Sequence, residues 1–268
     1  MKIFHPQSGM NGAQRDNCFL IQDNAGVELG QGSVIARNVK EIYPERPVDI
    51  VMELDAHPRA RDMLFGALRA QAALLHRQAG RAPARLYTLC QMGDVERYHY
   101  FKSFGFDDAD GDELFVWRLS KHERMIYPPL STQIIEIPRR SRAETEGVVR
   151  RMQSFGAGEH APEWLEDVSR MPNFCAFAVY GGSELWGEIV VTGEDQEARV
   201  EALYTVPKYR GHDVATALLS QVRLTLLERG VRFVSMNVPR RNLRAMRLLQ
   251  RMHFEWVRTD QLYMGIDL

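Results

Sequence analysis

The strongest constraint on the fold is an internal repeat, because both halves of the chain predict the same elements in the same order. The second half predicts strands at residues 198–206, 232–238, 254–258 and 261–268, with helices at 213–229 and 242–252. The first half predicts a helix from Asp62 to Gly80, a strand at 85–91, a helix at 95–104 and a strand at 113–120. Phe106 to Glu113 and Phe254 to Gln261 are both separations of seven residues. Matched order with matched spacing indicates two copies of one α/β unit.

Local patterns support these elements. The helix at 213–229 carries apolar residues at the 3.6-residue period and ends before Gly230, while the strand at 232–238 is rich in β-branched and aromatic residues. The second unit begins with a strand (132–137), two helices (143–154, 162–170) and a hairpin (173–180, 184–192). The N-terminal part of the first unit is shorter, with strands at 18–23 and 27–38 and no clear helical pair.

A polar segment at 121–131 that contains Pro128 and Pro129 separates the copies, since proline disfavours both helix and sheet. We therefore predict domains at 1–125 and 126–268, in an α/β (α+β) chain.

Composition excludes several classes of protein. The 268 residues are 45% hydrophobic with a net charge of −1, which suits a globular chain without a nucleic-acid or membrane partner. Five arginines at 240, 241, 244, 247 and 251 are typical of a solvated helix face. Cys18, Cys90 and Cys175 lack the spacing of a disulfide framework or a zinc site, so we expect no metal. The first residues do not resemble a signal peptide and no apolar run could span a membrane, so a cytoplasmic location is expected.

The segment at 206–219 joins a strand to a helix through Gly211. Such a turn presents backbone N–H groups at the positive end of a helix dipole, which suits a pyrophosphate. The same turn without a ligand is common in α/β proteins, and generic physics leaves both interpretations open.

The stretch EALYTVPKYRGHDVATALL (201–219) resembles the signature of the GNAT superfamily of acyl-CoA N-acyltransferases, and Val238, Asn242, Ala245 and Phe254 resemble its next block. The resemblance covers about 132–268. It implies two GNAT-like units, each a mixed, mostly antiparallel sheet flanked by helices, and acetyl-CoA as co-substrate.

The resemblance also assigns residues to the donor. Backbone groups of Leu203, Tyr204 and Thr205 would bond the pantetheine arm as an added strand would, and Asn242 would bond the arm or cap its own helix. The pyrophosphate would lie on amides of Arg210, Gly211, His212, Asp213, Val214 and Ala215.

Two residues depart from the family pattern. Asp213 replaces a glycine, and its carboxylate at ~5 Å from a diphosphate would cost roughly 3 kcal/mol at an effective dielectric near 20. We expect weakened binding, with the side chain turned to cap its helix or offset by Lys208, Arg210 or His212. Leu249 replaces a tyrosine that often protonates the departing thiolate, so the proton would come from Tyr204, Tyr263 or water.

Glu201 is the candidate base, since acyl transfer to an amine requires loss of the ammonium proton. Glu188 is the alternative base, and an exposed strand carboxylate without a role is the other interpretation of Glu201. In the family the acceptor pocket usually forms near the segment that holds His160 and Trp164; a plain surface loop is equally consistent.

The first copy lacks this chemistry. Its phosphate-loop position (56–62) contains no glycine, Met52 stands where Glu201 would be, and Asp94 stands where Asn242 would be. We interpret it as a degenerate, structural unit.

The leading hypothesis is an N-acyltransferase that moves an acetyl or short acyl group to a primary amine of a small molecule or peptide by direct attack. A non-catalytic acyl-CoA-binding regulator is the alternative, and an aminoacyl-tRNA-dependent transferase is a weaker one. Two units in one chain would mimic the common dimer of the family, so the chain would be a monomer or a homodimer.

Overall fold

The computed structural model describes residues 1–40, 42–137, 142–154 and 162–268, and the chain divides into two compact units. Unit 1 contains Met1–Asp112 together with Thr259–Leu268, and unit 2 contains Glu113–Arg258. The predicted domains at 1–125 and 126–268 differ from this division at both boundaries. Residues 113–125 belong with unit 2, and the end of the chain belongs with unit 1.

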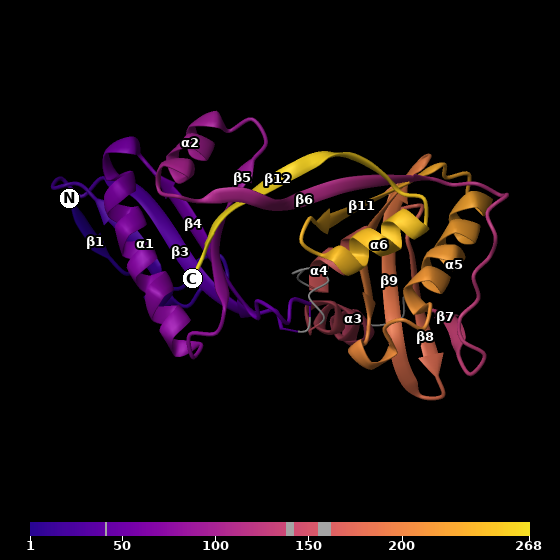
Figure 1. Ribbon diagram of the computed structural model, residues 1–268. Coiled ribbons are helices and arrows are strands. Elements are labelled where there is room, and N and C mark those ends of the chain that lie inside the picture. Colours follow the sequence, from indigo (N-terminus) through magenta and orange to yellow (C-terminus); the bar gives the residue numbers. More distant parts are fainter. Residues whose placement is uncertain (41, 138–141, 155–161) are drawn as a thin grey trace. The chain divides into compact units, whose positions relative to one another are not determined.

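Unit 1 has the strand order β1-β2-β3-β4-β5-β12, in which β4 and β5 are parallel and the other pairs that the register describes are antiparallel. Helix α1 lies along β3 and β4 and buries Leu64 and Leu68 (Figure 1). This helix begins at Pro58, earlier than predicted, because His57 accepts a hydrogen bond from the Arg59 amide and proline suits the first turn. The elements are β1 (Lys2–Phe4), η1 (Arg15–Asn17), β2 (Cys18–Gln22), β3 (Glu28–Asn38), β4 (Val48–Ala56), α1 (Pro58–Gln78), β5 (Ala84–Gln91) and α2 (Val95–Ser103).

Unit 2 has the strand order β6-β11-β10-β9-β8-β7, in which β10 and β11 are parallel. Its sheet is covered on both faces: Ile189 and Val191 of β9 pack in the core under α5, while Val190 packs with α3 and α4 (Figure 1). The elements are β7 (Gln133–Glu136), α3 (Arg142–Ser154), α4 (Pro162–Val168), β8 (Cys175–Gly181), β9 (Glu184–Glu194), β10 (Glu197–Thr205), η2 (Pro207–Tyr209), α5 (Val214–Glu228), β11 (Phe233–Pro239) and α6 (Leu243–Arg251).

Two long strands, β6 (Asp107–Arg118) and β12 (Glu255–Asp267), contribute residues to both units. Trp117 of β6 is fully buried in the core of unit 2 and lies 5.2 Å from Phe254 between ring centres. Met264 of β12 is fully buried in unit 1, where β12 pairs with β5. Each core is therefore completed by a strand from the other half of the sequence. The two strands predicted at 254–258 and 261–268 are one strand, and the mixed, mostly antiparallel fold class is confirmed.

The repeat is visible in equivalent details of the two units. Asp94 caps α2 by accepting from the Arg97 amide at 3.0 Å, and Asn242 caps α6 by accepting from the Ala245 amide at 3.1 Å. Each helix is followed by a left-handed residue, Gly105 at φ 81° and His253 at φ 60°. The alignment of Asp94 with Asn242 also makes Arg97 the counterpart of Ala245.

Candidate active site

Strands β10 and β11 run side by side for only part of their length. They pair in parallel from Glu197 to Arg199, whereas β10 pairs with β9 as far as Thr205. Among the described residues, the pairing with β11 extends no further than Arg199. The edge of β10 that carries Leu203, Tyr204 and Thr205 therefore borders a gap between two strands, which is the backbone arrangement that an extended ligand needs for strand-like hydrogen bonds.

A β-bulge interrupts β10 at this point. Val200 pairs with Val191 and Ala202 pairs with Val190, so Glu201 is the extra residue. Ala198 and Val200 pack in the core under α5, but Ala202 and Tyr204 pack in the core with α3 and α4. The bulge thus reverses the side-chain alternation of the strand where the gap opens.

Glu201 is held by neighbours on the sheet. Its Oε1 accepts a hydrogen bond from the Thr192 hydroxyl at 2.6 Å, and its Oε2 lies 3.7 Å from Nε of Arg199. Because its side chain is 19% exposed, the carboxylate is oriented but reachable from solvent. Such a group can accept a proton from a molecule that enters from outside.

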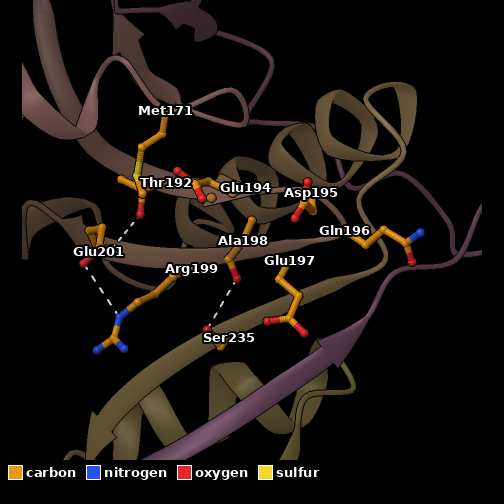
Figure 2. Close-up of a pocket in the computed structure, with 11 residues that line it drawn as sticks. Met171, Thr192, Glu194, Asp195, Gln196, Glu197, Ala198, Arg199, Glu201 and Ser235 are labelled. Carbon is orange, nitrogen blue, oxygen red and sulfur yellow. Dashed lines mark hydrogen bonds and ion pairs between the residues drawn. The ribbon is translucent and has the colours of Figure 1, made fainter.

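A cavity of about 670 Å³ adjoins Glu201, within the range typical of small-molecule sites. Figure 2 shows Glu201 at one end beside Thr192 and Arg199, and the turn with Asp195 and Gln196 at the other. Four carboxylates line the cavity against one arginine among its described lining residues, so its charge is negative. The lining residues are Met171, Thr192, Gly193, Glu194, Asp195, Gln196, Glu197, Ala198, Arg199, Glu201 and Ser235.

The segment after β10 forms the turn that the sequence predicts for a pyrophosphate. It passes through η2 and Gly211, which has φ 85°, to α5 at Val214. The Arg210 amide donates to the Pro207 carbonyl at 3.2 Å, so this N–H serves the turn. The first amides of α5 have no acceptor within the helix, because the i−4 carbonyl lies outside it.

Asp213 stands at the start of α5 in the left-handed conformation, with φ 57° and ψ 15°. This is the conformation that suits glycine and that Asp tolerates better than most residues. The prediction that its side chain caps the helix is wrong, because Asp213 makes no side-chain cap hydrogen bond. Its carboxylate instead lies 3.1 Å from Nη1 of Arg251, at the end of α6. Of the expected offsetting groups, Lys208 forms an ion pair with Glu184.

A buried polar cluster lies on the α3 side of the sheet. Glu188 is 1% exposed and pairs with Arg151 of α3 through Nη2–Oε1 at 2.6 Å and Nε–Oε2 at 3.0 Å, and it also accepts a hydrogen bond from the Tyr204 hydroxyl. Burial and the Glu188 charge raise the pKa of Tyr204, and the hydrogen bond to Glu188 raises the pKa of Arg151. The hydroxyl proton of Tyr204 is therefore already used in the hydrogen bond to Glu188.

Sequence reasoning identified Glu188 but missed Arg151. A glutamate within the apolar strand at 184–192 requires a buried partner. Arg151 lies three residues after the buried Val148 of α3, on the inward side of that helix, and this spacing was the available signal.

Residues 144–254 match the model of the acetyltransferase (GNAT) family. The match covers 111 of the 268 residues, all of them in the second half of the chain. No curated protein sequence matches the chain at a significant level.

Solved structures with the same fold cover nearly all of the chain. A GCN5-related N-acetyltransferase from Sphaerobacter thermophilus is 16% identical with a TM-score of 0.52, over 96% of this chain and 82% of that chain. Eis1 from Mycobacterium abscessus is 12% identical with a TM-score of 0.57, over 98% and 73%. A probable N-acyltransferase from Enterococcus faecalis V583 is 10% identical with a TM-score of 0.56; this chain is covered to 94% and spans only 62% of that protein. At these identities the similarity concerns the fold.

The other residues that the sequence predicts for the site lie in both units. Leu249 is fully buried in the α5 core, and Tyr263 lies in unit 1, where it stacks on Tyr87 at 5.4 Å. Trp164 packs against the core of α3 and α4, whereas His160 lies outside the described residues. In the described part of the chain, no group of His, Cys, Asp and Glu could hold a metal ion, and no helix is long and apolar enough to cross a membrane.

Proposed function

We propose that the GNAT domain transfers an acetyl or short acyl group from coenzyme A to the primary amine of a small molecule or peptide by direct attack. The carrying observation is the bulge in β10, which places the Glu201 carboxylate beside the strand gap and at the edge of the 670 Å³ cavity. In this proposal the gap receives the pantetheine arm along Leu203–Thr205, and the amides of Gly211–Ala215 receive the pyrophosphate.

The cavity is the proposed acceptor site. Its carboxylates, Glu194, Asp195, Glu197 and Glu201, favour an acceptor that arrives as a cation, as most primary amines do near neutral pH. Glu201 takes one proton from the ammonium, the amine nitrogen bonds to the thioester carbonyl carbon, and the carbon–sulfur bond breaks. The nitrogen loses a second proton as the amide forms. Because the Tyr204 hydroxyl donates to Glu188, water is the proposed carrier of this second proton to the departing thiolate.

The first test is donor binding. Acetyl-CoA at 100 times its dissociation constant should stabilise the protein by about 2.7 kcal/mol, which thermal unfolding detects easily. Turnover is then measured as release of free thiol with a panel of primary amines. Binding without release for any amine supports the alternative of an acyl-CoA-binding regulator, which the buried Leu249 at the position of the usual acid favours.

The second test concerns Glu201. Glu201→Gln should leave acetyl-CoA affinity unchanged and lower kcat by about 100-fold or more, since general-base catalysis contributes at least this factor. Its activity should recover partly at high pH, where the amine loses its proton to solvent. Glu255→Gln, the same change at an exposed position, should leave kcat unchanged. Equal turnover by Glu201→Gln and the unmodified protein would remove Glu201 from the mechanism.

A further inference from the structure

Arg251 occupies an unusual place for a residue at the end of a helix with an arginine-rich face. Its Nη1 lies 3.1 Å from the Asp213 carboxylate, and its Nη2 donates to the Thr216 hydroxyl in the first turn of α5. The guanidinium of α6 therefore connects to the phosphate-binding turn twice, through the residue before α5 and through its first turn. The Asp213 and Arg251 side chains are about half exposed, at 54% and 55%, so neither is locked in place by burial.

We propose that Arg251 is a donor-positioning residue whose positive charge offsets the Asp213 carboxylate, and that the two side chains act as a coupled pair on the diphosphate of the acyl donor. This inference rests on the proposed function, because it concerns how the same turn holds the donor.

The physical reason is charge placed at a helix start. The first amides of α5 attract an anion, but an unpaired carboxylate at Asp213 would repel it. With Arg251 beside Asp213, the pair adds no net charge to the turn, and the helix amides can attract the diphosphate. The guanidinium also has donors beyond those used for Asp213 and Thr216, so it can turn one toward a phosphate oxygen.

The test is a double-mutant cycle with acetyl-CoA affinity measured by calorimetry. Asp213→Asn keeps a residue that tolerates the left-handed conformation and removes the charge. We expect it to strengthen binding by about fivefold to tenfold, since it removes the repulsion between the Asp213 carboxylate and the diphosphate. Arg251→Ala should weaken binding by about thirtyfold in the unmodified protein but only about threefold with Asp213→Asn, a coupling of about tenfold.

The control is Arg247→Ala, which removes the same charge from an exposed position one turn earlier on α6. It should change affinity by less than about twofold, because it removes no partner of Asp213. The unfolding midpoint without ligand should be nearly the same for all variants, since an exposed ion pair contributes little to stability.

Equal losses for Arg251→Ala in both backgrounds would overturn the coupling, because Arg251 would then act without reference to Asp213. No loss in either background would overturn any role for Arg251. If the unmodified protein and every variant fail to bind acetyl-CoA, the proposed function itself is overturned together with this inference, and these results are distinguishable.

Discussion

In each unit two parallel strands pair over only part of their length, β4 with β5 in unit 1 and β10 with β11 in unit 2. The residues beside the resulting gap differ between the units. In unit 1, β4 pairs with β5 from Val48 to Val51, and β4 continues beyond this pairing to Ala56. Arg97 of α2 bridges the two strands here: it donates to the Leu54 carbonyl at 2.8 Å, the Leu89 carbonyl at 2.9 Å and the Thr88 hydroxyl at 2.8 Å. Burial lowers the pKa of this guanidinium from its ordinary value. At the equivalent position unit 2 has Ala245.

The comparison shows how one scaffold can keep or lose a ligand site. The gap exposes strand carbonyls, which need hydrogen-bond donors whenever they are buried. Unit 1 supplies the donors from its own α2, while unit 2 has only a methyl group at that position. Strand β4 also pairs with β3 without the bulge that marks β10. The predicted degenerate role of unit 1 remains a proposal, and Arg97 gives it a physical basis.

The largest expected effect tests whether each unit depends on the strand it receives. Trp117→Ala should lower the free energy of unfolding by about 3–5 kcal/mol, because it empties a fully buried site in the core of unit 2. Urea unfolding measures the loss. Tyr127→Ala, at a position 74% exposed, should change stability by less than about 0.5 kcal/mol. A fragment of 126–268 lacks Trp117 and should be insoluble. A stable fragment with full activity would contradict the conclusion that the core of unit 2 needs a strand from the first half of the sequence.

The next prediction introduces an arginine into unit 2 at the position equivalent to Arg97 of unit 1. Ala245→Arg should weaken acetyl-CoA binding by about 100-fold or more, which corresponds to about 2.7 kcal/mol, because the new guanidinium can fill the gap beside β10. Leu243→Arg adds the same charge at a position 62% exposed on the same helix and should leave affinity nearly unchanged. Normal binding by Ala245→Arg would show that the gaps of the two units are not equivalent.

The smallest expected effect is on stability, when Arg97 itself is replaced. Arg97→Ala should destabilise the protein by about 2 kcal/mol, since it leaves strand carbonyls without a charged donor, and acetyl-CoA affinity should stay the same. Methylguanidinium at millimolar concentration should restore part of the lost unfolding midpoint, more than ethylammonium does. Arg97→Lys, which keeps the charge without the planar fork, should be intermediate. Unchanged stability of Arg97→Ala would mean that the hydrogen bonds of Arg97 contribute nothing.

Much of the candidate site was predictable because its signals are local. The turn at 206–215 and the cap at Asn242 depend on a few consecutive residues and appear in the structure as expected. The left-handed state of Asp213 follows from the glycine position that it occupies. The partner of Asp213 was not predictable, because the five arginines of 240–251 look alike in sequence and only the tertiary structure brings Arg251 to the start of α5.

By itself, the sequence determined the repeat, most of the order of elements, the GNAT resemblance of the second half and the residues that differ from the family pattern. These follow from side-chain periodicity and backbone preference, which act over short stretches of chain. Only the tertiary structure decided which strand completes which core, that Arg97 bonds to both strands of its gap where unit 2 has Ala245, and which arginines face Asp213 and Glu188. Those choices depend on hydrogen bonds and charges that must be satisfied between residues far apart in sequence, and many sequence-equivalent partners compete for them until packing selects one.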